Sequence, residues 1–406
     1  MKMAEYKQSR KFRPIRKDGK FTHVNYGMGC TNGCAYCIQQ KDLEYNHGSS
    51  PHDFSVDSLV EQLERDQLVS RKQPLVIGNA TDPFLKRNLD HTKGLLRKLD
   101  RKRYKSPLAI ITKTYPDDRF FFGNSTLRAV RDLRHLKPVI LVSYVGYKDR
   151  KLERVSGESR LQLMKEASQK YKIPTILYCR PLVKAWMDED GESHEEKIER
   201  IANETKGIID AVVFGGLYYP EEVRDEIMRK GLKEPFDECF SGKRLDDPGV
   251  AHKLKKTFNK VNPEVPVFRS TSCGVSYVNG TPCFFGYYGL RSLERDNLEC
   301  NDSCNDQQRD LCRTETKKVS WWQVRRTLRE IGLKSKFKNH PLFVRVYDKL
   351  EKDQRYYLRH NLCKFVLDDT EIGFWKDWKD KGDSHWKRVY DNLVKLGFGI
   401  EEKGKK

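Results

Sequence analysis

The sequence predicts an α/β fold, a partial and open (β/α)6 barrel of the TIM type, with a cysteine-rich C-terminal extension and a basic tail rich in aromatic residues. Two observations predict the barrel. Apolar runs typical of buried parallel strands alternate six times with amphipathic helical stretches. Polar residues follow these runs, at the edge where such barrels carry their functional groups.

The six repeated units can be placed along the chain. We expect strands at residues 23–28, 74–80, 108–113, 139–145, 174–183 and 211–217. We expect helices at residues 55–69, 89–99, 125–136, 158–171 and 195–205. In the first helix, Ser55 or Asp57 can cap the N-terminus, and the apolar stripe consists of Leu59, Val60, Leu63 and Leu68.

Four regions follow from this pattern. We predict a basic N-terminal arm at 1–20, the barrel at 21–235, the cysteine-rich extension at 236–316 and the basic, tryptophan-rich region at 317–406. Within these regions, residues 219–260 are expected to be helical and charged, and 263–270 to form a strand.

Composition bounds the class of protein. The 406 residues are 33% charged and 37% hydrophobic, as in an ordinary soluble protein. The longest apolar runs, such as 138–145, are far too short to span a membrane, so no membrane partner is expected. Eleven unevenly spread cysteines favour reduced thiols and metal binding over a disulfide framework. We therefore expect a cytoplasmic protein.

Net charge favours a polyanionic partner. The formal charge is +20 and the pI about 9.3. Residues 317–406 hold 23 Lys and Arg against 13 Asp and Glu, so half of the excess charge lies in the tail. Because contacts from Lys and Arg to phosphates dominate nonspecific nucleic-acid affinity, DNA or RNA is the expected partner.

Three cysteines, Cys30, Cys34 and Cys37, lie on one glycine-rich loop after the first predicted strand. Three thiolates with no fourth cysteine nearby can hold a four-iron [4Fe-4S] cluster and leave one iron open to another ligand. Structural zinc is the weaker interpretation, because it needs four ligands and only His23 or His47 could complete the set.

This spacing, three residues and then two with an aromatic residue before the last cysteine, resembles that of the radical SAM superfamily. The resemblance implies that S-adenosylmethionine binds the open iron and is reductively cleaved to a 5′-deoxyadenosyl radical. It also implies an electron donor such as a flavodoxin or a ferredoxin. The cofactors then carry the reaction, and the protein supplies orientation and a dry pocket.

Residues 77–84, 110–113 and 142–143 resemble the spore photoproduct lyase branch of that superfamily. The resemblance implies cofactor contacts from four strand-end residues and from the loop aromatic: Thr81 and Asp82 to the amino group, Lys113 and Ser143 to the carboxylate or ribose, and Tyr36 to the adenine. The simpler alternatives are that Asp82 begins a turn before Pro83 and that Lys113 is a solvated strand end.

Two positions depart from that branch. Photoproduct lyases carry a cysteine hydrogen donor where this chain has Ala80, and a second tyrosine where it has Ile38. We therefore do not expect thymine-dimer repair by that relay, and the sequence assigns no catalytic residue.

A second group of cysteines follows the barrel. It consists of Cys273, Cys283, Cys300, Cys304 and Cys312. Four of these thiolates could hold an auxiliary iron–sulfur cluster or a zinc ion, and the spacing equally fits no metal. Cys179, Cys239 and Cys363 are isolated in the sequence and are expected to be packing residues.

The tail holds five of the six tryptophans: Trp321, Trp322, Trp375, Trp378 and Trp386. Aromatic residues interleaved with cations are typical of single-stranded nucleic-acid binding and also of a small helical core. An amphipathic helix is expected at 321–331, with its inward face formed by Trp322, Val324, Leu328 and Ile331.

The leading functional hypothesis is a radical SAM enzyme that acts on a nucleic acid or nucleotide, in repair or modification. The alternatives are a radical SAM enzyme that modifies peptides or proteins and a non-enzymatic, metal-stabilised nucleic-acid-binding protein.

Overall fold

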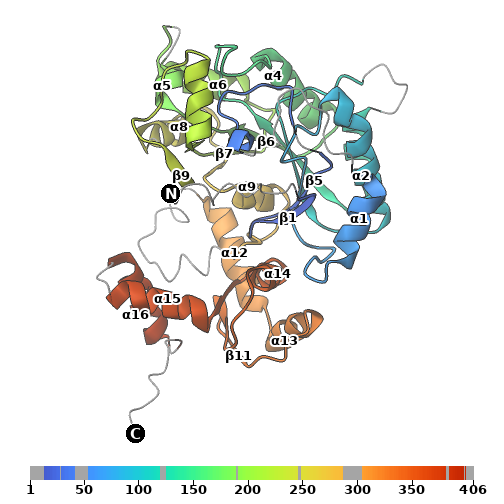
Figure 1. The fold of residues 1–406 in the computed structure, drawn as a ribbon, viewed down its shortest axis with the longest axis vertical. Coiled ribbons are helices and arrows are strands. Elements are labelled where there is room, and N and C mark those ends of the chain that lie inside the picture. The colour runs from blue at the N-terminus through green and yellow to red at the C-terminus, as the bar shows by residue number, and fades with distance from the viewer. Residues whose placement is uncertain are drawn as a thin grey trace, which may run out of the picture.

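The computed structural model describes residues 13–27, 29–41, 54–118, 125–188, 191–245, 248–286, 304–380, 384–396 and 398. Its centre is an eight-stranded sheet with the strand order β1-β2-β3-β4-β5-β6-β7-β10. Helices surround this sheet, and the C-terminal part of the chain, orange to red in Figure 1, forms a lobe beside it. The α/β architecture predicted from the sequence is confirmed.

All six predicted strands are present. Four are shorter than expected, and the other two have the expected length but begin and end one or two residues earlier. They are β2 (Thr22–Val24), β3 (Leu75–Ile77), β4 (Pro107–Thr112), β5 (Lys137–Ser143), β6 (Thr175–Cys179) and β7 (Ala211–Phe214). Each pairs in parallel with the next. The strand expected at 263–270 is β10 (Val267–Phe268), which extends the parallel sheet beyond β7 and past the predicted boundary at residue 235.

The outer face of the sheet carries the helices. They are α1 (Val56–Arg65), α2 (Leu89–Arg101), α3 (Thr126–Arg131), α4 (Gly157–Lys165), α6 (His194–Glu204) and α8 (Pro248–Val261). Ser55, and not Asp57, caps α1, because its hydroxyl accepts a hydrogen bond from the Ser58 amide at 3.1 Å. Leu59 and Leu63 of α1 are buried in the main core, as the apolar stripe predicts.

The inner face of the sheet is filled by the cysteine-rich extension. Helix α9 (Thr271–Val278) packs there, so that Val275 joins Val76 and Leu141 in a second core. Gly274 permits the close approach, since a Cβ at this position would lie 2.5 Å from a methyl group of Val213. The barrel interior is therefore a packed core on the side of α9.

Two stretches differ from the sequence prediction. The region 219–260 is only partly helical: α7 (Glu221–Arg229) lies between β8 (Leu217–Tyr219) and β9 (Phe240–Leu245), which pair antiparallel. In the expected basic arm, β1 (Ile15–Lys17) pairs antiparallel with β2. Lys17 can lie in this strand because its ammonium pairs with Asp66 at 2.6 Å.

The tail is a folded α/β lobe. Its sheet consists of β11 (Phe337–Asn339), β12 (Phe343–Val346) and β13 (Phe365–Asp368). Its helices are α13 (Trp321–Glu330), α14 (Lys352–Leu362), α15 (Asp369–Asp380) and α16 (Ser384–Lys395), and α12 (Asp306–Lys318) runs across the predicted boundary at 316. Two apolar clusters, one on each side of this small sheet, form its core.

This lobe contacts the N-terminal edge of the barrel sheet. The His360 ring nitrogen Nε2 lies 2.8 Å from the carbonyl oxygen of Gly19, and the Ser70 hydroxyl donates to Asn361 Oδ1 at 2.9 Å. Gly19 precedes β2 and Ser70 precedes β3. The lobe therefore lies at the edge of the sheet opposite to the carboxyl ends of its parallel strands.

The tryptophans of the tail divide between packing and exposure. Trp375 is 2% exposed and belongs to the lobe core, whereas Trp321 is 41% and Trp322 70% exposed. The prediction that Trp322 faces inward is wrong, because Val324, Thr327 and Leu328 form the buried face of α13. Ile331 ends the helix and is half-buried. The side chains of Trp378 and Trp386 lie outside the described set.

Within the described ranges, none of the helices combines the length and the apolarity that crossing a bilayer requires.

Candidate active site

A cavity of about 230 Å³ opens at the carboxyl ends of the parallel strands. Its wall brings together the predicted residues from different strand ends, namely Cys30, Cys34, Tyr36, Cys37, Thr81, Asp82, Lys113 and Ser143. The prediction that these residues share one site is consistent with this arrangement, because each follows or ends a strand of the same parallel sheet.

The cysteine loop is held by contacts from three directions. The Thr81 hydroxyl donates to the Gly29 carbonyl at 2.6 Å, and the Lys230 ammonium donates to the Gly33 carbonyl at 2.7 Å. The Ala35 amide donates to the Leu152 carbonyl at 3.0 Å. Gly33 has a φ of +61°, and a Cβ there would lie 2.9 Å from the Arg154 side chain. These contacts and the positive φ of Gly33 therefore fix the conformation of the cysteine loop.

The three thiols suit ligation of a positively charged group. Burial raises the pKa of Cys34 to about 12, and burial together with Asp82 raises that of Cys30 further. Thiolates in this wall thus require a compensating cation such as cluster iron. A four-iron cluster places a separate iron at each thiolate, so the three sulfurs need to line one cavity and not to meet at one ion. The donor set fits such a cluster.

The zinc interpretation lacks a fourth ligand. His23 lies on β2, with its Nε2 2.7 Å from a carboxylate oxygen of Asp18. His47 lies outside the described residues. In the part of the chain that the structure describes, no three His, Cys, Asp or Glu side chains converge to hold a single metal ion.

Asp82 connects the cysteine loop to the ends of β3 and β4. Its Oδ1 accepts hydrogen bonds from the Thr112 hydroxyl at 2.7 Å and the Phe84 amide at 2.9 Å. Its Oδ2 accepts from the Asn32 side chain and the Lys113 amide, both at 2.8 Å. A carboxylate has about four acceptor sites, so these donors occupy them. Its expected contact with a cofactor amine stays a prediction.

Lys113 is partly buried, and its ammonium is surrounded by three acceptors. Its ammonium donates to Glu153 and Ser143 at 2.7 Å each and to the Tyr36 hydroxyl at 2.8 Å, so all three of its N–H groups are used. Burial lowers the pKa of Lys113 to about 8. It is not a solvated strand end, and a direct contact with a cofactor carboxylate would require exchange of one of these partners.

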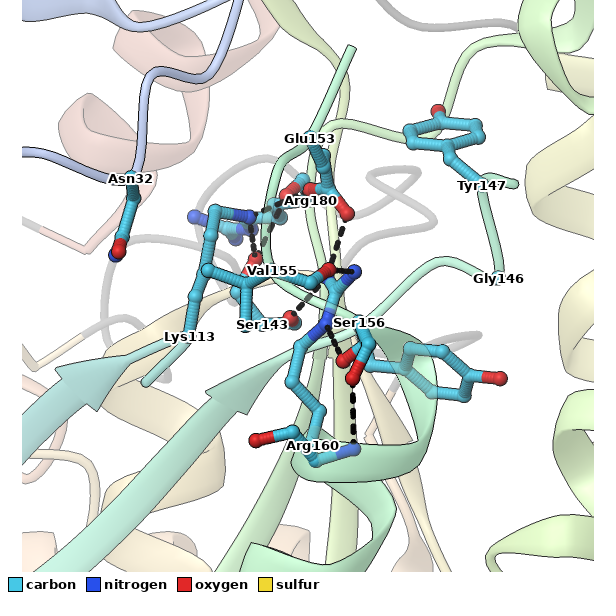
Figure 2. Close-up of polar contacts among 12 residues, drawn as sticks. Asn32, Lys113, Ser143, Gly146, Tyr147, Glu153, Val155, Ser156, Arg160 and Arg180 are labelled. Atoms are coloured by element: carbon cyan, nitrogen blue, oxygen red, sulfur yellow. Dashed lines mark hydrogen bonds and ion pairs between the residues drawn. The ribbon is translucent and has the colours of Figure 1, made fainter. Parts of the chain in front are cut away.

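Glu153 and Arg160 complete this network, and the sequence analysis missed both. The Arg160 guanidinium donates to Glu153 Oε2 at 2.5 Å and to the Ser143 carbonyl at 2.9 Å. Figure 2 shows Glu153 between the side chains of Lys113 and Arg160. Burial raises the pKa of Glu153, an effect that Arg160 opposes. Glu153 lies in a charged stretch that looks like a solvated loop in the sequence, and Arg160 lies in the first turn of the expected helix, where a charged residue is expected to face solvent.

Tyr36 lies in an aromatic cluster. Its ring stacks on Trp186 with a centroid distance of 5.9 Å, and Tyr147 meets both rings edge-on. Tyr36 is 8% exposed and its hydroxyl accepts the Lys113 hydrogen bond. Trp186 thus covers one face of the Tyr36 ring. The expected contact with adenine stays a prediction for the rest of the ring.

The other wall of the cavity contains Arg180 and the two positions that depart from the photoproduct lyase pattern. The Arg180 guanidinium donates to the Tyr178 hydroxyl at 3.0 Å and to the Phe214 carbonyl at 3.1 Å. Ala80 and Ile38 both line the cavity. The two positions at which the resemblance to photoproduct lyases implies a hydrogen-donor cysteine and a second tyrosine therefore lie in the cavity wall. This chain has apolar side chains at both.

The second cysteine group lies away from this cavity. The sulfurs of Cys273 and Cys283 are 3.8 Å apart, and Cys312 Sγ accepts a hydrogen bond from the Cys283 amide at 3.2 Å. Cys304 packs on the same inner core, as does Cys363, which the sequence had placed apart from the group. Cys300 lies outside the described residues. Among the described residues of this region, no three His, Cys, Asp or Glu side chains converge on a single metal ion, so the prediction of a second metal site gains no support.

Comparison with solved structures finds proteins of similar fold. A spore photoproduct lyase mutant matches at 15% identity and a TM-score of 0.46, over 64% of this chain and 79% of that one. Another, with bound AdoMet and dinucleoside spore photoproduct, matches at 16% identity and a TM-score of 0.44, over 65% and 81%. SuiB from Streptococcus suis, bound to S-adenosylmethionine, matches at 15% identity and a TM-score of 0.40, over 63% and 51%.

No protein-family model and no curated protein sequence matches the chain. At the identities of the structural matches the likeness concerns the fold, and the function of this chain depends on the residues of its own cavity.

Proposed function

We propose that this protein is a radical SAM enzyme that acts on nucleic acid. The observation that supports the proposal most is the cavity in which the buried Cys34 and the half-buried Cys30 and Cys37 meet Asp82 and Lys113 at the carboxyl ends of the strands. When bound, a [4Fe-4S] cluster and S-adenosylmethionine supply reductive cleavage of the sulfonium and a 5′-deoxyadenosyl radical.

The chain's own residues bind the cluster, orient the cysteine loop and exclude water. Cys30, Cys34 and Cys37 hold the cluster. Asp82 ties the cysteine loop to β4 through Asn32 and the Lys113 amide, which orients the cluster against the strand ends. Apolar wall residues such as Ile38, Ala80 and Ile111 exclude water, which protects a reactive intermediate from side reactions.

The electron comes from a separate protein in this proposal. A flavodoxin or ferredoxin is a suitable donor, since such a carrier reaches the low potentials at which iron–sulfur clusters work. A net charge of +20 favours association with an acidic partner.

The substrate class is proposed from charge and from the tail. The +20 charge favours a polyanion, and the exposed Trp321 and Trp322 offer flat surfaces for bases. The alternative, a peptide-modifying enzyme, needs auxiliary cluster ligands near its substrate. Cys273 instead packs on the inner core with α9, and neither Cys273 nor Cys283 lies in the cavity wall, so no observation favours that alternative.

Anaerobic reconstitution with iron and sulfide, followed by reduction with dithionite, tests the proposal. We expect 5′-deoxyadenosine to form from S-adenosylmethionine, and its yield to rise with single-stranded DNA or RNA but not with unrelated peptides. Absence of 5′-deoxyadenosine under all conditions, in protein that carries the cluster, would contradict the enzyme assignment. Stimulation by peptides alone would contradict the substrate class.

A further inference from the structure

We propose that a groove on the C-terminal lobe is a binding site for single-stranded nucleic acid, separate from the cavity with the three cysteines. The proposal deepens the proposed function, on which it rests for the substrate class. We call this surface the lobe groove. It is lined by Trp321, Arg325, Leu328, Arg329, Gly332, Leu333, Lys334, Ser335, Lys336, Phe337 and Tyr347, and its volume is about 970 Å³.

The shape of the groove follows from the local chain path. Helix α13 ends at Glu330, and Gly332, with a φ of +74°, turns the chain back toward β11. The Tyr347 amide donates to the Lys336 carbonyl at 3.1 Å, which fixes the far wall. The groove therefore lies between the C-terminal end of helix α13 and the edge strand β11.

The charge of the groove lining is the first observation that favours nucleic acid as the ligand. The lining contains four cations and no Asp or Glu. Within the described ranges none of these four forms an ion pair, whereas the neighbouring Arg326 on the same helix pairs with Glu330, Nε to Oε1, at 3.7 Å. A wall of uncompensated Lys and Arg suits a phosphate backbone.

Exposed aromatic rings are the second observation. Trp321 and Tyr347 are each 41% exposed in the groove, and Trp322 beside them is 70% exposed. Arg325 lies over Trp321, with its guanidinium carbon 4.9 Å from the ring centroid, and Phe337 packs on Trp321 at 5.2 Å. These contacts hold Trp321 in place. Rings with fixed positions, partly exposed among cations, bind unpaired bases by stacking.

Single-stranded nucleic acid fits both observations better than an acidic peptide does. A peptide carboxylate would use the four cations but leave the exposed rings without a function, whereas a single strand presents phosphates and flat bases at successive positions. A duplex would keep its bases stacked on each other and away from these rings.

The position of the groove constrains the substrate further. The lobe contacts the N-terminal edge of the barrel sheet, through His360 and Asn361, and the cavity opens at the carboxyl edge. Figure 1 shows α13 and β11 at one end of the molecule, and α5 (Lys184–Met187), whose Trp186 stacks on Tyr36, at the other. One nucleotide cannot occupy both sites. The groove therefore binds a part of a polymer that is remote from the reacting nucleotide.

The test measures binding of a fluorescein-labelled oligothymidylate of about 20 nucleotides to the full-length protein by fluorescence anisotropy. The groove variant is Lys334→Glu/Lys336→Glu, two exposed residues of the lining. The control is Lys256→Glu/Lys260→Glu, which makes the same charge change at two exposed positions of α8 on the barrel. A second pair, Tyr347→Ala and Tyr347→Phe, tests stacking.

We expect the groove variant to weaken binding strongly and to reduce the salt slope by about 1.4, because each lost phosphate contact removes about 0.7 from it for a single strand. Tyr347→Ala should weaken binding about tenfold with the slope kept, and Tyr347→Phe should restore it. The α8 control should bind as the unmodified protein does.

Equal loss in the groove and control variants would overturn the proposal, since binding would then depend on total charge alone. Equally tight competition by polyglutamate would also overturn it, because the groove would then recognise any polyanion. Cleavage of S-adenosylmethionine without added nucleic acid is expected to be unchanged in the groove variants. Failure of the binding test and failure of the enzyme assignment are therefore separate results.

Discussion

Two residues of the cavity, Asp82 and Lys113, have all their hydrogen-bonding capacity used within the protein. From the sequence they are expected to act on the cofactor alone. In the structure, Asp82 also holds the loop that carries Cys30 and Cys34, through the side chain of Asn32. Loss of Asp82 should therefore affect the cluster site as well as cofactor binding.

We predict that Asp82→Ala lowers both the iron content per chain and the free energy of unfolding, the latter by about 2–4 kcal/mol. The reason is that Asn32, Thr112 and two backbone amides lose a buried acceptor together, and each unsatisfied group costs roughly 1–3 kcal/mol before water relieves part of it. Iron analysis and urea denaturation measure the two effects. Thr112→Val, which removes one of these donors, should cost only about 1 kcal/mol. Full iron content in Asp82→Ala would show that the loop does not depend on this carboxylate.

Glu153 is the second residue whose role only the structure reveals. Its buried carboxylate lies between the partly buried Lys113 and the buried Arg160. Removing one partner of a buried ion network leaves uncompensated charge and typically costs about 3–5 kcal/mol. We predict a loss of that size for Glu153→Ala in urea denaturation, with displacement of Tyr36 visible as a change in aromatic circular dichroism.

The matched control is Lys148→Ala, which breaks an ion pair between Lys148 and Glu192 at the surface, 3.1 Å long. Exposed pairs contribute about 1 kcal/mol or less. If Glu153→Ala were no more damaging than Lys148→Ala, the network around Lys113 would be dispensable for the fold.

Strand-end residues could be predicted from the sequence, because parallel strands bring their carboxyl ends to one edge whatever the rest of the chain does. The hydrogen bonds among them could not. Asp82 and Lys113 are thirty-one positions apart, and which acceptor an ammonium finds depends on side-chain placement across three strands. Glu153 and Arg160 carry no local signal, since a buried charge network and a solvated charged loop have the same composition.

At the scale of elements, five of the six parallel strands were predictable because each is mostly a run of apolar residues that is largely buried, whereas β2, with the sequence Thr-His-Val, is buried without being such a run. The missed strands β1 and β11 are edge strands of their sheets, with the sequences Ile-Arg-Lys and Phe-Lys-Asn. An edge strand needs no apolar run, and charged residues there limit pairing with other chains. Strands β12 and β13 of the lobe were missed as well, although their sequences, Phe-Val-Arg-Val and Phe-Val-Leu-Asp, are largely apolar and buried at every position.

Helix α14 offers a test of how the lobe is attached. His360 on this helix is 5% exposed, its Nε2 bonds to the Gly19 carbonyl, and its Nδ1 is buried without a hydrogen-bond partner among the described residues. Burial lowers the pKa of His360 to about 4, an effect that the Gly19 carbonyl and Asp18 oppose and Arg359 supports. The folded protein therefore resists the protonation that the unfolded chain accepts below about 6.5.

The sign of the pH effect follows. The unfolded chain binds more protons than the folded one between about pH 6.5 and 4, so the contribution of a neutral His360 is complete above about 6.5 and is lost as the pH falls toward 4. We predict that His360→Gln removes about 2 kcal/mol of the acid-side loss of stability between pH 7.5 and 5, measured by urea denaturation, because about 1.36 kcal/mol is lost per pH unit below about 6.5. His252→Gln, at an exposed position of α8, is the control. The same pH dependence in both variants would show that the lobe interface does not contain this group.

On the scale of the whole molecule, the cavity with three cysteines and the C-terminal lobe lie at opposite edges of the barrel sheet. The cavity with three cysteines opens at the carboxyl edge, and the lobe with its groove contacts the amino edge. The sequence predicted both features and could not relate them, because the position of a C-terminal lobe is decided by a few long-range contacts such as that of His360 with Gly19. The arrangement favours a polymeric substrate that spans the molecule.

In the proposed function, Cys30, Cys34 and Cys37 hold a four-iron cluster at which S-adenosylmethionine is cleaved. The most direct test replaces each cysteine by alanine, with Cys239→Ala as a control at a half-buried cysteine outside the cavity wall. After anaerobic reconstitution, iron content, electron paramagnetic resonance and 5′-deoxyadenosine formation are measured together. We predict that each of the three variants loses the cluster signal and forms no 5′-deoxyadenosine, because each lacks a thiolate ligand, while the control keeps both. Wild-type cleavage in any one of the three variants would contradict the account.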